Sequence, residues 1–432
     1  MKTFVWKDLS TAERTAALRR PENRRDPAVA ARVKTIFDDI EARGFEALSD
    51  WAVRLDGHAP DAVRLNAATV DAARAQLTAD DLSAMELAVE NVRAFQAAEL
   101  PGDGPVIAPK PGLSLQRVYR PLTTAGLYAP GGTAPLFSTL IMTAVPALVA
   151  GVKNRVCITP PATDGSIHPM MIAAGAASGL DTVWRVGGAH GIAALALGVL
   201  EGIPAADKIF GPGNKYVAEA KRYATERVSG LAIDMPAGPS ELLVIADDTA
   251  NAKLVAADLL SQAEHDADAQ VILVALSRDI AEKIAAEVRV QVERLPRAAI
   301  ARASLDQARL FVVSSIAEAA EVSNLYGPEH LAIQVVDIDG IIPHLTAAGT
   351  IFAGTYAAET FGDYAAGPSH VLPTDGAAKA WDGITVRSFL TSFVVQRATK
   401  AGAATIAPAA ARLARLEGLE AHALAADFRL EV

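Results

Sequence analysis

Cysteine is nearly absent from this sequence, since Cys157 is the single thiol in 432 residues. One thiol excludes an internal disulfide, and it also excludes zinc sites built from paired CxxC motifs. Cys157 lies in the apolar run RVCIT, so we expect a buried structural thiol rather than a nucleophile. So little cysteine predicts a cytoplasmic protein.

Long apolar runs and basic blocks are missing as well. No stretch approaches the ~18 apolar residues of a membrane span, and the N-terminus has no apolar segment followed by a cleavage site. The net charge is −10 at pH 7, and no run of Lys or Arg interrupts the sequence. We therefore expect no membrane association and no nucleic-acid partner.

The sequence does contain a regular alternation of apolar runs. The first 100 residues resemble helices, with apolar residues at three-to-four spacing. Further along, short β-rich runs such as TAGLY, RVCIT and LLVIAD alternate with Ala-rich helical runs. Strands that are apolar on both faces predict parallel sheets covered by helices on both sides. The expected fold is α/β, with two doubly wound Rossmann-like domains with parallel sheets and small helical N- and C-terminal extensions.

The same alternation predicts where the domains begin and end. We expect an N-terminal extension over 1–26, a first Rossmann-like domain over 27–128 and 241–383, a second over 129–240, and a helical tail over 384–432.

Five polar stretches interrupt this scaffold and are candidates for a shared site. In open α/β sheets, ligands bind beyond the carboxyl ends of the strands, so we expect a cleft there. The stretches are YAPGGTAPLFS (128–138), FGPGNKYVAEAK (210–221), SQAEHD (261–266), YGPEHL (326–331) and ETFGDYAAGPSHVLPT (359–374).

Gln262 and His265 are a possible pair of metal ligands, because residues three apart share one face of a helix. The alternative is the solvated polar end of a helix. Asp363, His370 and His422 are the other candidates for a site without thiols.

Two further stretches each allow a functional and a structural interpretation. Glu329 and His330 are suited to proton transfer and water activation, or they form a solvated surface turn. FGPGN lacks the G-x-G-x-x-G fingerprint, but its helix start near Asn214 suits a phosphate. A tight turn with a helix cap explains the same pattern.

Taken together, six stretches in this order resemble the histidinol dehydrogenase family: LYAPGGTAPLFSTLIM, KIFGPGNKYVAEAK, IDMPAGPSELLVIAD, DLLSQAEHD, YGPEHL and FGDYAAGPSHVLPT. The resemblance runs from about Val118 to the C-terminus, and more loosely over the helical start. It implies a homodimer that binds one Zn2+ per subunit and oxidises L-histidinol through L-histidinaldehyde to L-histidine with two NAD+, the last steps of histidine biosynthesis. The first Rossmann-like domain would carry zinc and the catalytic residues, the second would bind NAD, and the tail would reach the partner subunit.

The resemblance also implies roles for single residues. Glu329 and His330 match the catalytic pair. Zinc ligands are implied at Gln262, His265, Asp363 and His422, the last from the partner subunit. Substrate contacts are implied at these four ligands and at Ser240, His330 and Glu417. NAD contacts are implied at Tyr128, His190 and Asn214. His370 matches a histidine of the active-site loop.

One position departs from the family pattern, because GGAH places His190 where the family usually has glutamine. This leaves room for altered NAD binding, or for a paralogue that oxidises another primary alcohol such as a sulfonated diol. Glu417 argues against a sulfonate, which would call for Arg or Lys. A zinc-binding protein without turnover is a third possibility, and retention of Glu329 and His330 argues against it.

Overall fold

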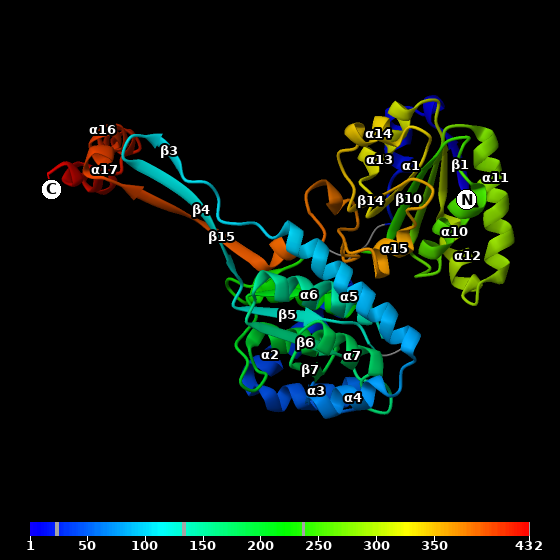
Figure 1. The fold of residues 1–432 in the computed structure, drawn as a ribbon, viewed down its shortest axis with the longest axis horizontal. Coiled ribbons are helices and arrows are strands. Elements are labelled where there is room, and N and C mark those ends of the chain that lie inside the picture. Colours follow the sequence, from blue (N-terminus) through cyan, green and yellow to red (C-terminus); the bar gives the residue numbers. More distant parts are fainter. Residues whose placement is uncertain (22–25, 132–134, 236–237, 432) are drawn as a thin grey trace.

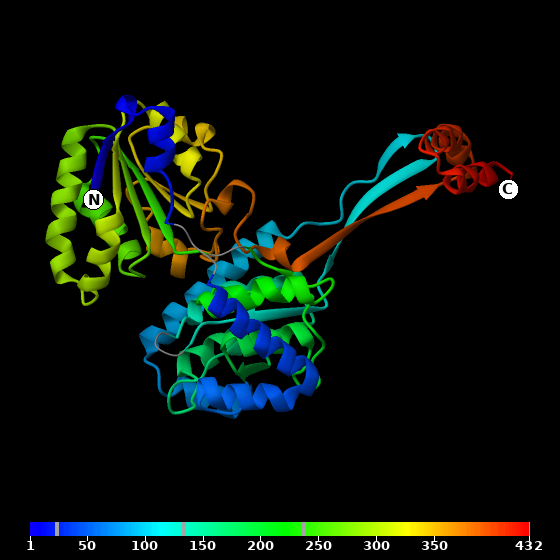
Figure 2. The same cartoon turned by 180° about the vertical axis from the view of Figure 1, so that it is seen from behind.

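The computed structural model describes residues 1–21, 26–131, 135–235 and 238–431. The chain forms two α/β domains and a long arm that extends away from both (Figure 1). The same view from behind shows the arm projecting on one side, with the C-terminus at its tip (Figure 2).

The first domain is built on sheet A, six parallel strands in the order β1-β12-β11-β10-β13-β14. One face of the sheet packs against α10, α11 and α12, and the other packs against α13 and α14. The strands are β1 (Lys2–Val5), β10 (Glu241–Ala246), β11 (Gln270–Ala275), β12 (Arg309–Val312), β13 (His330–Gln334) and β14 (Thr350–Ala353). The helices are α1 (Thr11–Ala17), α10 (Ala252–Ala263), α11 (Arg278–Gln291), α12 (Ala298–Gln307), α13 (Ile316–Tyr326), α14 (Ile338–Ile341) and α15 (Glu359–Tyr364).

The second domain is built on sheet B, in the order β2-β7-β6-β5-β8-β9, with β2 antiparallel and the rest parallel. Helices α5, α6 and α7 cover one face, and α2, α3, α8 and α9 cover the other. The strands are β2 (Asp61–Arg64), β5 (Thr124–Tyr128), β6 (Asn154–Thr159), β7 (Thr182–Arg185), β8 (Lys208–Phe210) and β9 (Ala232–Ile233). The helices are α2 (Pro27–Arg43), α3 (Phe45–Asp56), α4 (Ala67–Arg74), α5 (Ala79–Glu99), α6 (Phe137–Ala150), α7 (Pro169–Ala177), α8 (Gly188–Leu197) and α9 (Lys215–Arg227).

The arm is an antiparallel sheet C in the order β15-β4-β3, with two helices at its tip (Figure 1). Both Phe393 and Val394 on β15 are about half exposed, at 51% and 52%. The elements are β3 (Ile107–Lys110), β4 (Leu113–Pro121), β15 (Leu390–Ala398), α16 (Lys400–Leu416) and α17 (Glu420–Asp427). Short 3-10 turns elsewhere are Trp6–Asp8, Val292–Arg294, Ile342–His344, Ala377–Lys379, Val386–Phe389 and Phe428–Leu430.

The central strands of sheet A are buried along their whole length. Every residue of β10 and of β11 is buried, as the continuous apolar runs ELLVIA and QVILVA predict for a sheet covered on both faces. Side-chain caps define where helices begin, as at Asn251, whose oxygen accepts from the backbone N–H of Lys253 before α10.

The two parallel-sheet domains confirm the expected fold class, but the predicted domain boundaries need correction. Residues 27–99 and 124–128 belong to the second domain, because β2 pairs with β7 and β5 pairs with β6 and β8, while β3 and β4 between them form part of the arm. Residues 2–5 are no extension, because they pair with β12 as the edge strand of sheet A. The tail after 383 is not wholly helical, because β15 pairs with β4 along nine residues.

Candidate active site

The predicted catalytic pair lies at the amino edge of sheet A, not at the expected carboxyl edge. His330 is the first residue of β13, and it lies in register with Leu242, the second residue of the neighbouring β10. Helices between parallel strands run in the opposite direction, so α10 and α13 bring their C-terminal ends to this edge. Glu329 and His330 therefore sit beside helix C-termini, which carry partial negative charge.

His330 and two carboxylates, those of Glu359 and Asp363, form a compact cluster. The ligand-type atoms of His330, Glu359 and Asp363 all lie within 4.8 Å of one another. Nε2 of His330 is 3.4 Å from Oδ1 of Asp363, and Nδ1 is 3.6 Å from Oε1 of Glu359. Sequence analysis missed Glu359, although its place four residues before Asp363 puts both carboxylates on one face of α15.

Backbone contacts fix the orientation of the catalytic pair. The backbone N–H of Glu241 donates to Oε2 of Glu329 at 2.8 Å, and Nδ1 of His330 lies 3.1 Å from the carbonyl oxygen of Glu241. A carbonyl oxygen only accepts, so Nδ1 carries the hydrogen. Nε2 of His330 is then the nitrogen that can take up a proton or contact a ligand.

Several carboxyl groups are buried close to His330. Burial raises the pKa of Glu329 to about 7 and the pKa of Glu359 to about 8, and the nearby His330 partly opposes both shifts. Burial lowers the pKa of His330, but the carboxylates of Glu329, Glu359 and Asp363 outweigh that effect and raise it to about 10. The arrangement therefore favours a positive charge at its centre.

Unpartnered polar atoms show where such a charge would sit. Gln262 at the end of α10 is 1% exposed, and neither its amide nitrogen nor its amide oxygen has a hydrogen-bond partner. Nε2 of His330 and Oδ1 of Asp363 are buried and make no hydrogen bond either. Because buried polar atoms are nearly always bonded, these atoms fit a cation ligated by nitrogen and oxygen.

The remaining predicted ligands divide between this place and the arm. His265 follows α10 on the exposed rim, where the charges of Asp363 and His330 act on it. His422 is exposed on α17, and Glu417 is exposed between α16 and α17. Within one chain, His265 thus lies near Asp363 and Gln262 is buried in the last turn of α10, whereas α17 with His422 and the turn with Glu417 lie at the tip of the arm (Figure 1).

His370 and Ser240 border the same site. Nδ1 of His370 lies 2.7 Å from the carbonyl oxygen of Asp363, and Nε2 lies 3.1 Å from Oγ1 of Thr139 on α6. His370 therefore joins the amino edge of sheet A to the second domain. Ser240 directly precedes β10, and its carbonyl accepts from the backbone N–H of Gln270.

The predicted NAD contacts cluster at the carboxyl edge of sheet B. Tyr128 ends β5, and its pKa is raised to about 12 by burial, against a hydrogen bond from the backbone of Gly188. His190 is 1% exposed; its Nε2 lies 2.9 Å from Oδ2 of Asp56, and its Nδ1 has no partner. Helices α6 and α8 begin here without a side-chain cap, so the positive ends of their dipoles lie at this edge.

Asn214 caps its own helix, as the structural interpretation of FGPGN predicts. Its Oδ1 accepts from the backbone N–H groups of Tyr216 at 3.0 Å and Val217 at 3.2 Å. The loop before it is held by a buried ion pair, Lys221 with Asp234, which also bonds to the backbone of Gly211. Of the stretch 128–138, residues 132–134 lie outside the described residues.

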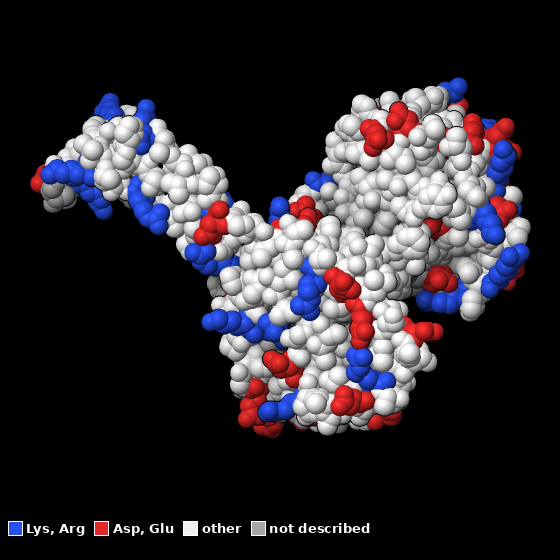
Figure 3. Space-filling model, in the orientation of Figure 1, with Lys and Arg blue, Asp and Glu red and all other residues white. Residues whose placement is uncertain are grey.

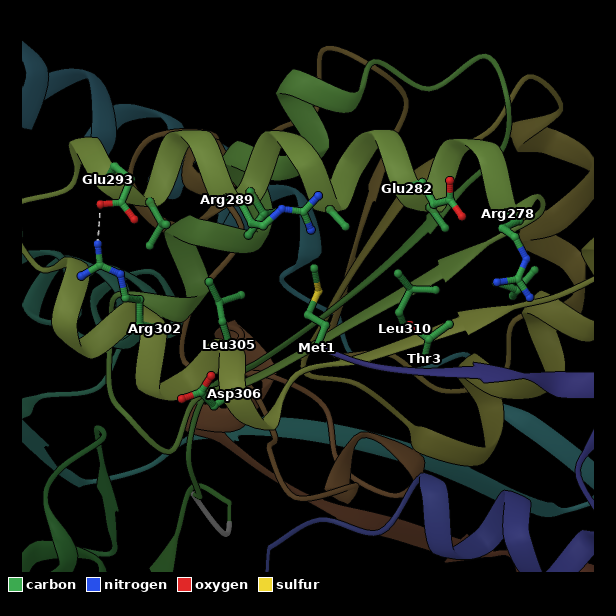
Figure 4. Close-up of a pocket in the computed structure, with 15 residues that line it drawn as sticks. Met1, Thr3, Arg278, Glu282, Arg289, Glu293, Arg302, Leu305, Asp306 and Leu310 are labelled. Atoms are coloured by element: carbon green, nitrogen blue, oxygen red, sulfur yellow. Dashed lines mark hydrogen bonds and ion pairs between the residues drawn. The ribbon is translucent and has the colours of Figure 1, made fainter.

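One cavity lies away from the candidate active site. A cavity of about 810 Å³ lies between α11, α12 and strands β1 and β12 (Figure 4). It is lined by side chains of both signs, such as Arg289 and Glu282, and none of the candidate site residues borders it. On the face drawn in Figure 3, basic and acidic side chains are interspersed over both domains.

Two expectations about the rest of the chain can be compared with the structure. Cys157 is fully buried in β6, and burial raises its pKa to about 12, which confirms a structural thiol. Among the described residues, no helix has both the length and the apolar character to cross a membrane.

Comparison with known proteins gives one consistent answer. The family model for histidinol dehydrogenase matches residues 18–430. A histidinol dehydrogenase from Xanthomonas oryzae pv. oryzae is 43% identical over the whole of both chains, and one from Salmonella choleraesuis is 42% identical over 98% of this chain and 96% of the relative. The crystal structure of histidinol dehydrogenase from Elizabethkingia anophelis superposes with a TM-score of 0.95 at 38% identity, over 100% of this chain and 98% of the other. The chain therefore belongs to the histidinol dehydrogenase family.

Proposed function

We propose that the protein oxidises L-histidinol through L-histidinaldehyde to L-histidine, with two NAD+, as the last steps of histidine biosynthesis in the cytoplasm. Membership of the family supports the reaction. The observation that carries the proposal is the buried cluster of His330, Glu359 and Asp363, together with the buried Gln262 amide, which has no hydrogen-bond partner. It combines proton-transfer groups with a place for a cation.

One Zn2+ per subunit is proposed for that place, held by Gln262, His265 and Asp363 and by His422 of the partner subunit. The unpartnered Gln262 amide and the carboxyl-rich surroundings fit this ion. When bound, zinc supplies positive charge that orients the alcohol and has no redox role. Positive charge beside Asp363 also opposes the carboxylates that hold a proton on His330.

The first oxidation needs a base for the hydroxyl proton. Nε2 of His330 takes that proton as hydride leaves the carbinol carbon for the nicotinamide of the first NAD+. The second oxidation needs water added to the aldehyde. Glu329 takes a proton from that water, and His330 again accepts the hydroxyl proton as the second hydride leaves for a second NAD+. Cys157, buried in β6, takes no part.

Substrate and cofactor would contact both domains and the arm. Ser240 borders the substrate, and Glu417 of the partner subunit supplies a carboxylate suited to a cationic amino alcohol. NAD would lie along the carboxyl edge of sheet B, against Tyr128, His190 and Asn214. The uncapped starts of α6 and α8 suit its phosphates.

The position of the arm supports a homodimer with shared active sites. His422 is proposed as a ligand, yet it lies at the arm's tip, away from Asp363 in the same chain (Figure 1). The tip also exposes apolar side chains, with Leu413 at 63% and Leu416 at 65%. Docking on a second copy would bury these side chains and complete each site.

The test is NADH formation with a panel of amino alcohols and sulfonated diols, with and without a chelator. L-histidinol should give two NADH per molecule, and the chelator should abolish the rate until zinc is restored. Turnover of a sulfonated diol in preference to histidinol would identify a paralogue with another substrate. No NADH from any alcohol would favour a zinc-binding protein without turnover.

A further inference from the structure

Arg20, in the segment after α1, contacts both chain segments that carry the catalytic pair. Its guanidinium donates to both carboxylate oxygens of Glu241, at 2.5 and 2.7 Å. It also donates to the carbonyl oxygens of Tyr326 at 3.0 Å and Gly327 at 3.2 Å, and it lies over the Tyr326 ring at 3.7 Å. One side chain thus joins the start of β10 to the turn that leads into Glu329.

One of these segments contacts the catalytic pair directly, and the other leads into it along the chain. The backbone N–H of Glu241 donates to Glu329 at 2.8 Å, and the carbonyl oxygen of Glu241 lies 3.1 Å from Nδ1 of His330. Gly327 is two residues before Glu329 in the chain, at the left-handed end of α13. A shift at either segment therefore moves a contact made by Glu329 or His330.

The Glu241 carboxylate accepts its side-chain hydrogen bonds from Arg20, and its charge also acts on Arg309. Its side chain is 2% exposed, and its other hydrogen bond comes from the backbone N–H of Asp375 at 3.0 Å. Removing one partner of a buried charge pair leaves the other charge uncompensated, which disturbs the structure around it. The bidentate geometry is specific to a guanidinium, because an ammonium is a point charge.

We propose that Arg20 is a positioning residue for the Glu329–His330 pair, acting through Glu241 and the 326–327 turn. The inference rests on the proposed roles of Glu329 and His330. Arg20 makes no contact with substrate or cofactor in this arrangement. Its role is to hold Glu329 and His330 in the geometry in which each accepts a proton. A displacement of ~1 Å at such a site lowers the rate about 10²-fold.

The experiment compares Arg20→Gln and Arg20→Lys with a matched control, Arg14→Gln. Arg14 lies on the same N-terminal segment, donates to Glu321 at 3.1 Å and lies over Trp6 at 4.6 Å, but it contacts neither β10 nor the 326–327 turn. We expect kcat for histidinol oxidation to fall about 10- to 10²-fold in both Arg20 variants. KM for NAD should stay unchanged, and Arg14→Gln should keep the wild-type kcat.

Two further measurements separate positioning from a general loss of structure. Added guanidinium ion should restore part of the kcat of Arg20→Ala, because the side chain is 15% exposed and leaves a cavity open to solvent. Arg20→Gln combined with Glu241→Gln should lose no more than the worse single variant, as expected for two residues that act as a unit.

Several outcomes would overturn the inference, and they differ from a failure of the proposed function. Wild-type kcat in Arg20→Gln would show that the contact is dispensable. An equal loss in Arg14→Gln, or no rescue by guanidinium, would show that the segment serves stability alone. If instead Glu329→Gln and His330→Gln kept full activity, the proposed catalytic roles would fail, whatever Arg20 does.

Discussion

The two α/β domains contribute opposite edges of their sheets to the candidate active site. Sheet A presents the amino ends of its strands to the site, with His330 at the start of β13. Sheet B presents carboxyl ends, with Tyr128 at the end of β5. His370 joins the two edges, through the carbonyl of Asp363 on one side and Oγ1 of Thr139 on the other.

This difference determines which charge each edge favours. Helix C-termini reach the amino edge of sheet A, and their partial negative charge adds to the carboxylates there. Helix N-termini reach the carboxyl edge of sheet B, where α6 and α8 begin uncapped. One edge therefore suits a cation and a cationic substrate, and the other suits the phosphates of a dinucleotide.

Buried polar groups also differ between the two edges. Gln262, His330 and Asp363 leave four buried atoms without a hydrogen bond on the sheet A side, although Nε2 of His330 and Oδ1 of Asp363 lie 3.4 Å apart. On the sheet B side, the charged groups pair with one another, as Lys221 does with Asp234 and His190 with Asp56. We expect substitutions at the first edge to act on metal and rate, and substitutions at the second to act on stability and cofactor affinity.

The largest expected effect is on zinc binding and activity. It tests whether the site at the sheet A edge needs a residue from a second chain. His265→Ala and His422→Ala should each lose zinc and activity. After mixing and subunit exchange, some heterodimers should carry one intact site. Random exchange gives about a quarter of wild-type activity at most, because half the dimers are mixed and each has one good site.

Mass spectrometry can confirm that exchange has taken place. If exchange occurs and no activity returns, the arm serves its own subunit, and the shared-site proposal is wrong.

Glu329→Gln should lower the rate of aldehyde oxidation by ~10²–10⁴-fold, because the amide keeps the shape but cannot accept the proton. NADH formation from L-histidinaldehyde measures this step. Reduction of the aldehyde to histidinol by NADH should largely survive. Equal loss in both directions would mean that Glu329 has a structural role, or that one base serves both steps.

Lys221→Met should act mainly on stability, because it leaves Asp234 buried and unpaired at the sheet B edge. We expect a loss of about 3–5 kcal/mol in the free energy of unfolding, measured with denaturant. Lys215→Gln is the control on the same helix, since its ion pair with Asp26 is exposed. A Lys221→Met protein as stable as Lys215→Gln would contradict the distinction drawn between the two edges.

His190→Gln should have the smallest effect. It restores the usual side chain of the family, and it removes the contact with Asp56 at 2.9 Å. We expect a changed KM for NAD and little change in KM for histidinol. An unchanged KM for NAD would place His190 outside the cofactor site and assign it to the scaffold with Asp56.

Periodicity in the sequence was enough to predict two parallel-sheet domains, because a buried strand such as β10 has five apolar residues in a row, LLVIA, after Glu241. It did not predict which sheet each segment joins. The edge strand β2 reads DAVR, with a charged residue at each end, and it pairs with β7 only in the folded chain. The pairing of β15 with β4 likewise depends on contacts between residues far apart in sequence.

For the site, the resemblance supplied most of the residues and the structure supplied their arrangement. The structure places His265 where the charge of Asp363 acts on it and buries Gln262 one turn earlier on α10, and their role as zinc ligands stays a prediction. Glu359 was missed because a single Glu in the polar stretch ETFGD carries no sequence signal of burial, although it is 2% exposed here. The amino-edge location was missed although YGPEH directly precedes the apolar run LAIQVV, so that Glu329 and His330 lie at the amino end of the strand formed there.

The N-terminal strand has a consequence for how the chain is made. Trp6, next to β1, donates to Glu321, which is 315 residues later in the chain. At ribosomal speeds of about 5–20 residues per second, roughly 15 to 60 s separate the synthesis of these two residues. The second domain, encoded between them, can fold during that interval. The N-terminal strand must wait, unpaired and open to proteases or chaperones, until β12 emerges and closes sheet A.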